Sequence, residues 1–308
     1  MKLNIAEIFT PYEKQAEFLL SPARNKLFLG GRFAGKSWCL TLQVLLLALI
    51  NGCNGALLGR TESDLKKNLL PFLRFHLETL QKATGGYNWI RRYSVGDQQV
   101  ELQNGATILW RGYDRVDKLR GLNLGYVALD EIEWSESDPI RVYETILPAI
   151  RVPCPRPTFA LATSPNGLRG LTALFRRKQL EGDPNFYVAR ATSYANPHID
   201  PEVVESCKST MSKQRFETEI LALASRPHMA IFDQFAESTH IVNHKKGQRG
   251  SKYIIGIDWG LNKAAMIAVE ALEDGTWIVI DEQIEKPLSR GHFRDSVRGF
   301  IQKVCGDK

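Results

Sequence analysis

The sequence is poor in cysteine and histidine, and its cysteines follow no recognisable spacing. It has five cysteines and six histidines in 308 residues. The odd number and wide scatter of the cysteines exclude a disulfide framework, and their spacing matches no zinc site. We therefore expect a protein of a reducing compartment. The five are Cys39, Cys53, Cys154, Cys207 and Cys305.

The chain also lacks a hydrophobic run long enough to cross a bilayer. Its long apolar stretch, residues 38–50, is too short and is interrupted by Thr41 and Gln43. The first residues, MKLNIAEIF, carry no signal-peptide pattern. We expect no membrane association.

Neither charge sign is in large excess. With 40 basic and 34 acidic residues, the formal net charge is +6, which is compatible with an anionic polymer as partner but does not establish one. Any single basic cluster is more simply a solvated face. The clusters lie at 91–92, 111–120, 169–178 and 245–252.

A phosphate-binding loop is the clearest motif present. Residues 30–37, GGRFAGKS, match the spacing G-x-x-x-x-G-K-S, and they lie between an apolar strand at 26–29 and the apolar helix at 38–50. Such a loop turns its backbone N–H groups towards a polyphosphate, and the helix N-terminus adds positive dipole character. Lys36 would reach the β- and γ-phosphates and Ser37 would bind Mg²⁺. The expected nucleotide-binding residues are Gly30, Gly31, Arg32, Phe33, Ala34, Gly35, Lys36 and Ser37.

A second motif, at residues 126–131, completes the expected site. Four residues of strand character end in Asp130 and Glu131, which is typical of the Walker B motif. Asp130 would hold Mg²⁺, and Glu131 would orient and deprotonate the attacking water. An acid pair at a strand end is weak evidence alone, but together with Lys36 it predicts hydrolysis of ATP.

Tyr12 and Gln15 lie three residues apart on a short helix expected at 11–20, just before the loop. A glutamine amide can read adenine and a tyrosine ring can stack on it, so both are candidates for base recognition. An ordinary N-terminal helix with an exposed glutamine explains the pattern equally well.

Apolar strands alternate with helices, which predicts an α/β fold with a mostly parallel sheet flanked by helices, of the P-loop NTPase (ASCE) type. Asn104-Gly105 predicts a hairpin between strands at 99–102 and 107–110. Further strands are expected at 55–60 and 158–164, and a helix at 62–81 with a kink at Pro71.

The composition of the sequence changes after about residue 226, and a polar, basic and turn-rich stretch follows. The expected organisation is an ATPase domain at 1–230, a polar and basic linker at 231–252 and a second domain at 253–308. Three strands, at 253–258, 264–270 and 277–281, and a helix at 290–304 are expected in the second domain.

Taken together, these motifs resemble the large terminase subunit of tailed bacteriophages, which packages DNA. The resemblance covers nearly the whole chain. It rests on the arginine inside the phosphate-binding loop, on residues 112–121 leading into Asp130 and Glu131, on the strand-end run 163–166 and on the later strand that bears Asp258.

The resemblance implies roles for further residues. Arg32 would contact the γ-phosphate as an arginine finger within the subunit, although a surface salt bridge also explains it. Thr163, Ser164 and Asn166 would couple ATP hydrolysis to DNA movement, although a plain strand-to-loop turn explains them too. A nucleotide-sensing role for Arg60 stays open.

For the second domain, the resemblance implies the start of a ribonuclease H-like nuclease in which Asp258 binds a divalent metal. Such sites need several converging carboxylates. Asp281, Glu282 and Asp295 are not assigned. We expect an incomplete nuclease, as in an expression fragment, a split gene product or a truncated prophage copy.

The implied function is an ATP-driven motor that translocates double-stranded DNA into the procapsid. Its implied partners are DNA, a portal protein and a small terminase subunit, with a homo-oligomeric ring in the host cytoplasm, transiently at the portal vertex. Two alternatives remain: a helicase or other translocase of the same P-loop class, and an inactive terminase that only binds DNA or portal.

Overall fold

The computed structural model describes residues 4–167, 169–224, 240–244, 246–247, 252–259, 264–285 and 290–306. The chain divides into two compact units, Met1–Asp233 and Gln234–Lys308. Most of the linker expected at 231–252 lies outside the described residues.

The larger unit is built on one eight-stranded sheet with the order β3-β4-β5-β2-β6-β7-β1-β8. From β5 to β8 in this order all neighbours pair in parallel, while β3 and β4 extend the β5 edge with antiparallel pairing. The predicted mostly parallel α/β sheet is therefore confirmed. The strands are β1 (Asn25–Gly30), β2 (Gly55–Gly59), β3 (Ile90–Ser94), β4 (Gln99–Leu102), β5 (Thr107–Gly112), β6 (Tyr126–Asp130), β7 (Thr158–Thr163) and β8 (Phe186–Ala191).

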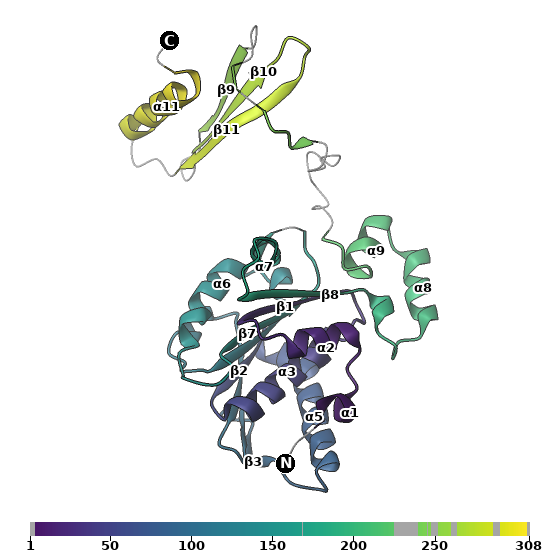
Figure 1. The fold of residues 1–308 in the computed structure, drawn as a ribbon. Coiled ribbons are helices and arrows are strands. Elements are labelled where there is room, and N and C mark those ends of the chain that lie inside the picture. The colour runs from purple at the N-terminus through teal and green to yellow at the C-terminus, as the bar shows by residue number, and fades with distance from the viewer. Residues whose placement is uncertain are drawn as a thin grey trace. The chain divides into compact units, whose positions relative to one another are not determined.

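Helices cover both faces of this sheet (Figure 1). Because side chains alternate along a strand, Phe28 and Leu57 join the apolar cluster that includes α2, α3 and α5, whereas Leu27 and Leu58 join the cluster that includes α6 and α7. Burial on both faces explains why these strands read as continuous apolar runs. The helices are α1 (Ile5–Phe9), α2 (Glu13–Leu20), α3 (Lys36–Asn51), α5 (Leu70–Ala83), α6 (Pro139–Ile146), α7 (Gly170–Leu180), α8 (Pro201–Thr210) and α9 (Lys213–Glu219).

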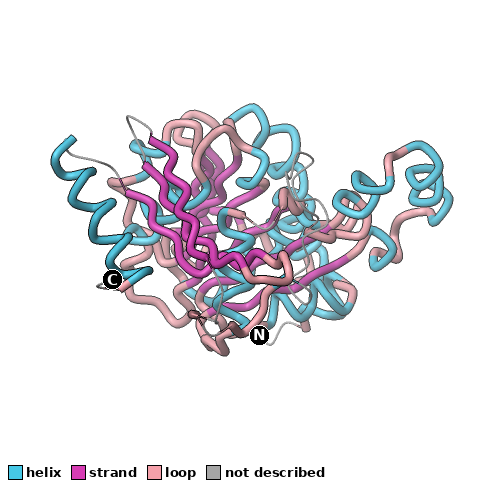
Figure 2. The backbone as a smooth tube through the Cα atoms, turned by 90° about the horizontal axis from the view of Figure 1, so that it is seen from above, coloured by secondary structure: helices cyan, strands magenta, loops and turns pink. Residues whose placement is uncertain are grey.

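The helices α8 and α9 do not cover the sheet but stand beyond its β8 edge (Figures 1 and 2). They follow β8 through a short turn, Ser193–Ala195. The residues around this turn reach the phosphate-binding loop, as described below.

The helix predicted at 62–81 is present as an unbroken helical segment, and a π-helical turn inside it was not predicted. The segment forms α4 (Glu62–Asp64), the π-helical turn η1 (Leu65–Leu69) and then α5, with Pro71 in the first turn of α5. Pro71 directly follows the π-helical turn, where it removes one backbone N–H donor from the helix.

The hairpin predicted at Asn104-Gly105 is confirmed by the antiparallel pairing of β4 with β5. The strands β3 and β8 were not predicted. Both lie at edges of the sheet, and β3, with the sequence IRRYS, is largely exposed. Edge strands lack the buried apolar pattern by which inner strands are recognised.

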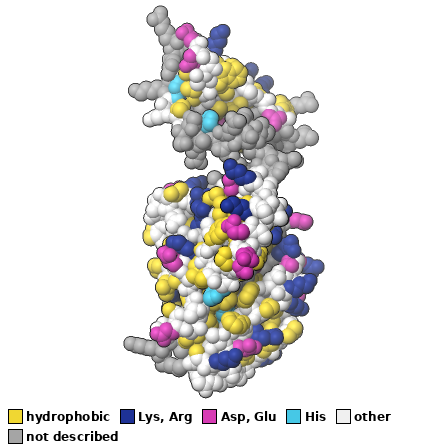
Figure 3. Space-filling model, turned by 90° about the vertical axis from the view of Figure 1, so that its right-hand side faces the viewer, with side chains coloured by type: hydrophobic (Ala, Val, Ile, Leu, Met, Phe, Trp, Pro, Cys, Tyr) yellow, Lys and Arg dark blue, Asp and Glu magenta, His cyan; other side chains and the backbone are white. Residues whose placement is uncertain are grey.

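The smaller unit contains an antiparallel sheet with the order β11-β10-β9 and one helix, α11 (Arg290–Cys305). Its strands are β9 (Lys252–Trp259), β10 (Ala264–Ala271) and β11 (Trp277–Glu285). Phe300 and Val304 of α11 pack with Met266 and Ala268. Other apolar side chains of this sheet are exposed, among them Trp277 and Ile284, and Figure 3 shows apolar side chains on the surface of this unit.

No helix among the described residues is long and apolar enough to cross a membrane.

Candidate active site

The phosphate-binding loop runs from the end of β1 at Gly30 to the start of α3 at Lys36, as its spacing predicts. Gly35 has a φ of +69°, a conformation that favours glycine. A Cβ on Gly31 would collide with the backbone oxygen of Ile220, and one on Gly30 would lie 2.7 Å from Cγ of Lys36. Each glycine thus allows the close packing that shapes the loop.

Lys36 lies at the centre of the site and is almost fully buried. Its Nζ donates to the backbone oxygen of Gly31 at 3.0 Å and lies 3.3 Å from Oε1 of Glu131. The strands β1, β7 and β6 are neighbours and parallel, so their carboxyl ends meet at one edge of the sheet. This arrangement brings the loop lysine and the Walker B glutamate together.

Asp130 is buried at the end of β6, and its Oδ2 accepts a hydrogen bond from Oγ of Ser37 at 3.5 Å. Burial raises the pKa of Asp130, and the charge of Glu131 adds to this effect while Lys36 opposes it. Its Oδ1 is buried without a hydrogen-bond partner in the described part of the chain. A carboxylate with a free oxygen beside a serine hydroxyl fits the oxygen ligands that Mg²⁺ prefers.

Glu131 is joined to the end of the neighbouring strand β7. Its Oε2 accepts from the backbone N–H of Ser164 at 2.9 Å and from Oγ1 of Thr163 at 3.2 Å, and its Oε1 accepts from Oγ of Ser164 at 3.3 Å. Glu131 itself has a φ of 51°, which is unusual for a residue with a side chain. Residues held in such a conformation cluster at functional sites.

Asn166, the third residue of the predicted coupling motif, contacts a glutamate that the sequence reasoning missed. Its Nδ2 donates to the backbone oxygen of Glu133 at 2.7 Å, and Oε1 of Glu133 accepts from the N–H of Thr172 in α7 at 2.8 Å. Glu133 is buried, and burial raises the pKa of its carboxyl. Its sequence context carries no motif that would have revealed this contact.

Arg32 forms an ion pair with a residue of α9. Its Nε lies 2.6 Å from Oε2 of Glu219, and Nε of Arg215 lies 2.8 Å from the other oxygen of the same carboxylate. The loop is further held by Nδ2 of Asn196, which donates to the oxygen of Phe33 at 2.6 Å, and by Oγ of Ser193, which donates to the oxygen of Arg32. No local signal in the sequence predicts these contacts.

Tyr12 and Gln15 both contact the backbone of the loop. The Tyr12 hydroxyl donates to the oxygen of Ala34 at 2.7 Å, and Nε2 of Gln15 donates to the oxygen of Gly35 at 3.4 Å. Burial raises the pKa of Tyr12, so its hydroxyl keeps the proton that it donates. Both side chains thus support the backbone of the loop, and their proposed contact with a base stays a prediction.

Arg60 pairs with Asp64, with 2.9 Å between Nε and Oδ2. Both line a cavity of about 230 Å³ that also borders Asp130, Glu131 and Trp134. Arg60 therefore lines the same cavity as Asp130 and Glu131, the two acidic residues of the candidate site.

Asp258 lies in β9, opposite Ala265 of β10. Asp281 pairs with Lys303 at 2.9 Å. In the part of the chain that the structure describes, no group of three or more His, Cys, Asp or Glu side chains is placed to hold a metal ion. The structure therefore does not gather a carboxylate cluster around Asp258 there.

A family model and a curated protein that match this chain both describe a terminase large subunit. Residues 27–238 match the family described as terminase large subunit, T4likevirus-type, N-terminal. The terminase large subunit of Escherichia phage T5 is 25% identical over 211 residues, which are 65% of this chain and 47% of that protein. The chain thus spans about half the length of this curated relative.

Solved structures of large terminases share the fold. One from a thermophilic bacteriophage has a TM-score of 0.59 at 18% identity, over 96% of this chain and 75% of that one. The large terminase ATPase domain of Thermus phage P74-26 has a TM-score of 0.54 at 18% identity, over 70% of this chain and 96% of that one. The HK97 bacteriophage large terminase has a TM-score of 0.56 at 13% identity, over 98% and 68%. The family match at residues 27–238 covers more than two thirds of this chain, so the chain belongs to the terminase large subunit family of the T4likevirus type.

Proposed function

We propose that this chain is the ATP-hydrolysing subunit of a motor that moves double-stranded DNA into a procapsid. The observation that carries the proposal is the meeting of Lys36 with Glu131 at 3.3 Å, beside the Ser37 and Asp130 pair, at one sheet edge. A phosphate-binding lysine, a metal-binding pair and a candidate base are the parts that ATP hydrolysis requires.

In the proposed reaction, the backbone N–H groups of the loop and the Lys36 ammonium bind the β- and γ-phosphates. Ser37 and Asp130 would hold Mg²⁺, which would supply positive charge beside the phosphates. Glu131 orients the attacking water and accepts its proton. Arg32 stabilises the charge on the γ-phosphoryl group, for which it must leave Glu219.

The coupling step is proposed to begin at Glu131. A nucleotide draws Lys36 towards its phosphates, so Glu131 loses that partner while Thr163 and Ser164 still hold it. A shift of this strand end is passed through Asn166 and Glu133 to the first turn of α7.

The proposed domains, partners and place of action are those expected of a large terminase subunit. We propose an ATPase domain at 1–230, a linker at 231–252 and a ribonuclease H-like nuclease domain at 253–308, with Asp258 as a metal ligand. The proposed partners are DNA, a portal protein, a small terminase subunit and further copies of the chain in a ring. The proposed place of action is the host cytoplasm and the portal vertex of the procapsid.

Two properties of similar proteins support this proposal. A large terminase of a thermophilic bacteriophage, 18% identical to this chain, has been solved in complex with ADP and with ATP-γ-S. The similar Thermus phage structure is an ATPase domain. The mild excess of basic residues suits contacts with DNA phosphates.

Steady-state ATP hydrolysis by the chain and by Glu131→Gln, with and without duplex DNA, tests the proposal. The parent should turn over ATP, whereas the variant should bind ATP and lose about 10²- to 10⁴-fold in turnover. Loss of ATP binding by Lys36→Ala completes the expected pattern. A parent chain that does not bind ATP would overturn the proposal, and ATP-driven separation of a forked duplex would favour a helicase.

A further inference from the structure

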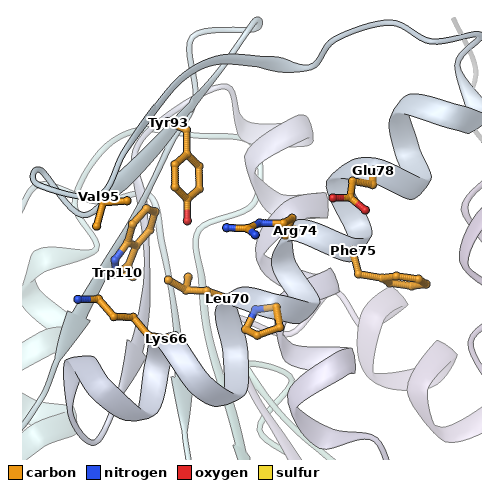
Figure 4. A pocket seen from close by; sticks show the side chains of 9 residues that line it. Lys66, Leu70, Arg74, Phe75, Glu78, Tyr93, Val95 and Trp110 are labelled. Atoms are coloured by element: carbon orange, nitrogen blue, oxygen red, sulfur yellow. The ribbon is translucent and has the colours of Figure 1, made fainter.

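A cavity of about 430 Å³ lies in the larger unit, between the turn η1 and α5 on one side and the strands β3 and β5 on the other. It shares no residue with the phosphate-binding loop or the Walker B acids. Figure 4 shows Lys66 and Arg74 projecting from the helical side towards Tyr93 and Trp110 on the strand side.

Most of the cavity wall is apolar. Leu70, Phe75 and Val95 line it, and the rings of Tyr93 and Trp110 lie 5.4 Å apart with an angle of 33° between their planes. Phe75, Tyr93 and Val95 are exposed by 52, 40 and 59%. Large apolar side chains that are exposed around a cavity are typical of an interaction site.

The charged groups of the cavity are two cations, Lys66 and Arg74, and one carboxylate, Glu78. Trp110 is 1% exposed, and its Nε1 has no hydrogen-bond partner in the described part of the chain. Within the same part, Lys66 and Arg74 form no ion pair with Asp or Glu. Two nearby exposed cations without an acidic partner favour an acceptor with negative charge.

We propose that this cavity is the docking site of a partner protein segment that carries a large apolar side chain beside a carboxylate. The apolar walls would enclose the large side chain, as interface pockets enclose anchor residues. Arg74 and Lys66 would bind the carboxylate through charge-assisted hydrogen bonds.

Charge and shape favour a protein segment over nucleic acid. Proteins bind a phosphate backbone through many cations that neutralise successive phosphates. Here two cations share the cavity with a carboxylate, Glu78, and the wall between them is apolar. This combination resembles the core of a protein interface.

The cavity adjoins the candidate active site through one turn of the chain. Lys66 of η1 lines the docking cavity, whereas Asn68 and Leu69 of the same turn line the smaller cavity beside Asp130 and Glu131. A π-helical turn is rare and is frequent at functional sites. An occupant of the docking cavity would thus contact a turn that also borders the Walker B acids.

Selection of phage-displayed random dodecapeptides on the full chain, without nucleotide, tests the proposal independently of ATP hydrolysis. The enriched peptides should share an aromatic or aliphatic residue next to Asp or Glu. Fluorescein-labelled synthetic copies should bind Arg74→Glu at least about tenfold more weakly than the parent. Arg176→Glu, an exposed arginine of α7 outside the cavity, is the matched control and should bind as the parent does.

A second readout follows the buried indole. Trp110→Phe keeps an aromatic ring but removes the N–H. In ¹H–¹⁵N spectra the indole signal that this variant lacks belongs to Trp110, and in the parent it should shift when a peptide binds.

Three outcomes would overturn the proposal. The first is equal binding of the selected peptides to the parent and to Arg74→Glu. The second is a loss of duplex-oligonucleotide binding in Arg74→Glu without any peptide effect, which would assign the cavity to nucleic acid. The third is self-association of the parent in sedimentation equilibrium that Arg74→Glu abolishes, which would assign the cavity to a second copy.

Discussion

The backbone N–H of Ser164 donates a hydrogen bond to Oε2 of Glu131 at 2.9 Å, and this bond joins the end of β7 to the candidate catalytic base. Thr163 supplies a second donor to the same oxygen. The carboxylate that would activate water is therefore positioned by the segment that would carry motion away from the site.

Removal of the Thr163 hydroxyl should loosen Glu131 while leaving the strand intact. Thr163→Val should lower kcat for ATP hydrolysis by about tenfold with little change in nucleotide affinity, because a poorly oriented base loses part of its contribution. Thr158→Val is the matched control, since this threonine begins the same strand and its hydroxyl donates to the oxygen of Arg156, away from Glu131. Equal effects of the two variants on kcat would contradict a positioning role for Thr163.

Arg32 has two possible roles: it contacts the γ-phosphate of ATP, or it serves only the ion pair with Glu219. Two substitutions distinguish these roles. If Arg32 contacts the γ-phosphoryl group, Arg32→Ala should lower kcat by about 10³-fold. Arg215→Ala removes the other arginine from the same carboxylate and should leave kcat near that of the parent. Similar small effects of both substitutions in an ATPase assay would show that Arg32 serves only the ion pair.

Glu133 should matter for stability as well as for coupling. Glu133→Ala leaves the N–H of Thr172 without its acceptor inside the protein, which should cost about 1–3 kcal/mol in the free energy of unfolding. Glu133→Gln keeps an acceptor oxygen and should recover most of this loss in urea denaturation. If both variants unfold at the same urea concentration, the hydrogen bond to α7 contributes nothing measurable.

His76 should make the larger unit less stable in mild acid. Burial lowers the pKa of His76 from 6.5 to about 4, and its Nδ1 has no partner in the described structure. Between these two values the unfolded chain binds the proton and the folded chain does not, so stability falls as the pH decreases from about 6.5 to about 4. The full loss is about 3 kcal/mol.

Urea denaturation at several pH values measures this effect. His76→Gln cannot titrate, so its stability should depend less on pH over this range. His198→Gln, which alters an exposed histidine, should keep the pH dependence of the parent. An unchanged profile in His76→Gln would refute the assignment.

The central strands and the places of residues 30–37 and 126–131 at strand ends could be predicted because their signals are local. The run 26–37 contains strand, loop and helix start in consecutive residues, and the parallel pairing of buried strands then brings its end beside Asp130. The division of the segment around Pro71 could not be predicted in the same way. Its π-helical turn depends on how Leu65 and Leu69 pack against the core, not on the local pattern.

The sequence by itself determined the strand–loop–helix run at 26–37, the acid pair at a strand end and the alternation of strands and helices, because each depends on adjacent residues. Only the tertiary structure decided that Glu131 bonds to Ser164, that Arg32 pairs with Glu219 and that Trp110 faces a cavity with Arg74. These partners are separated by many residues along the chain. Their contacts depend on the order of the strands and the packing of side chains between layers, which no local spacing records.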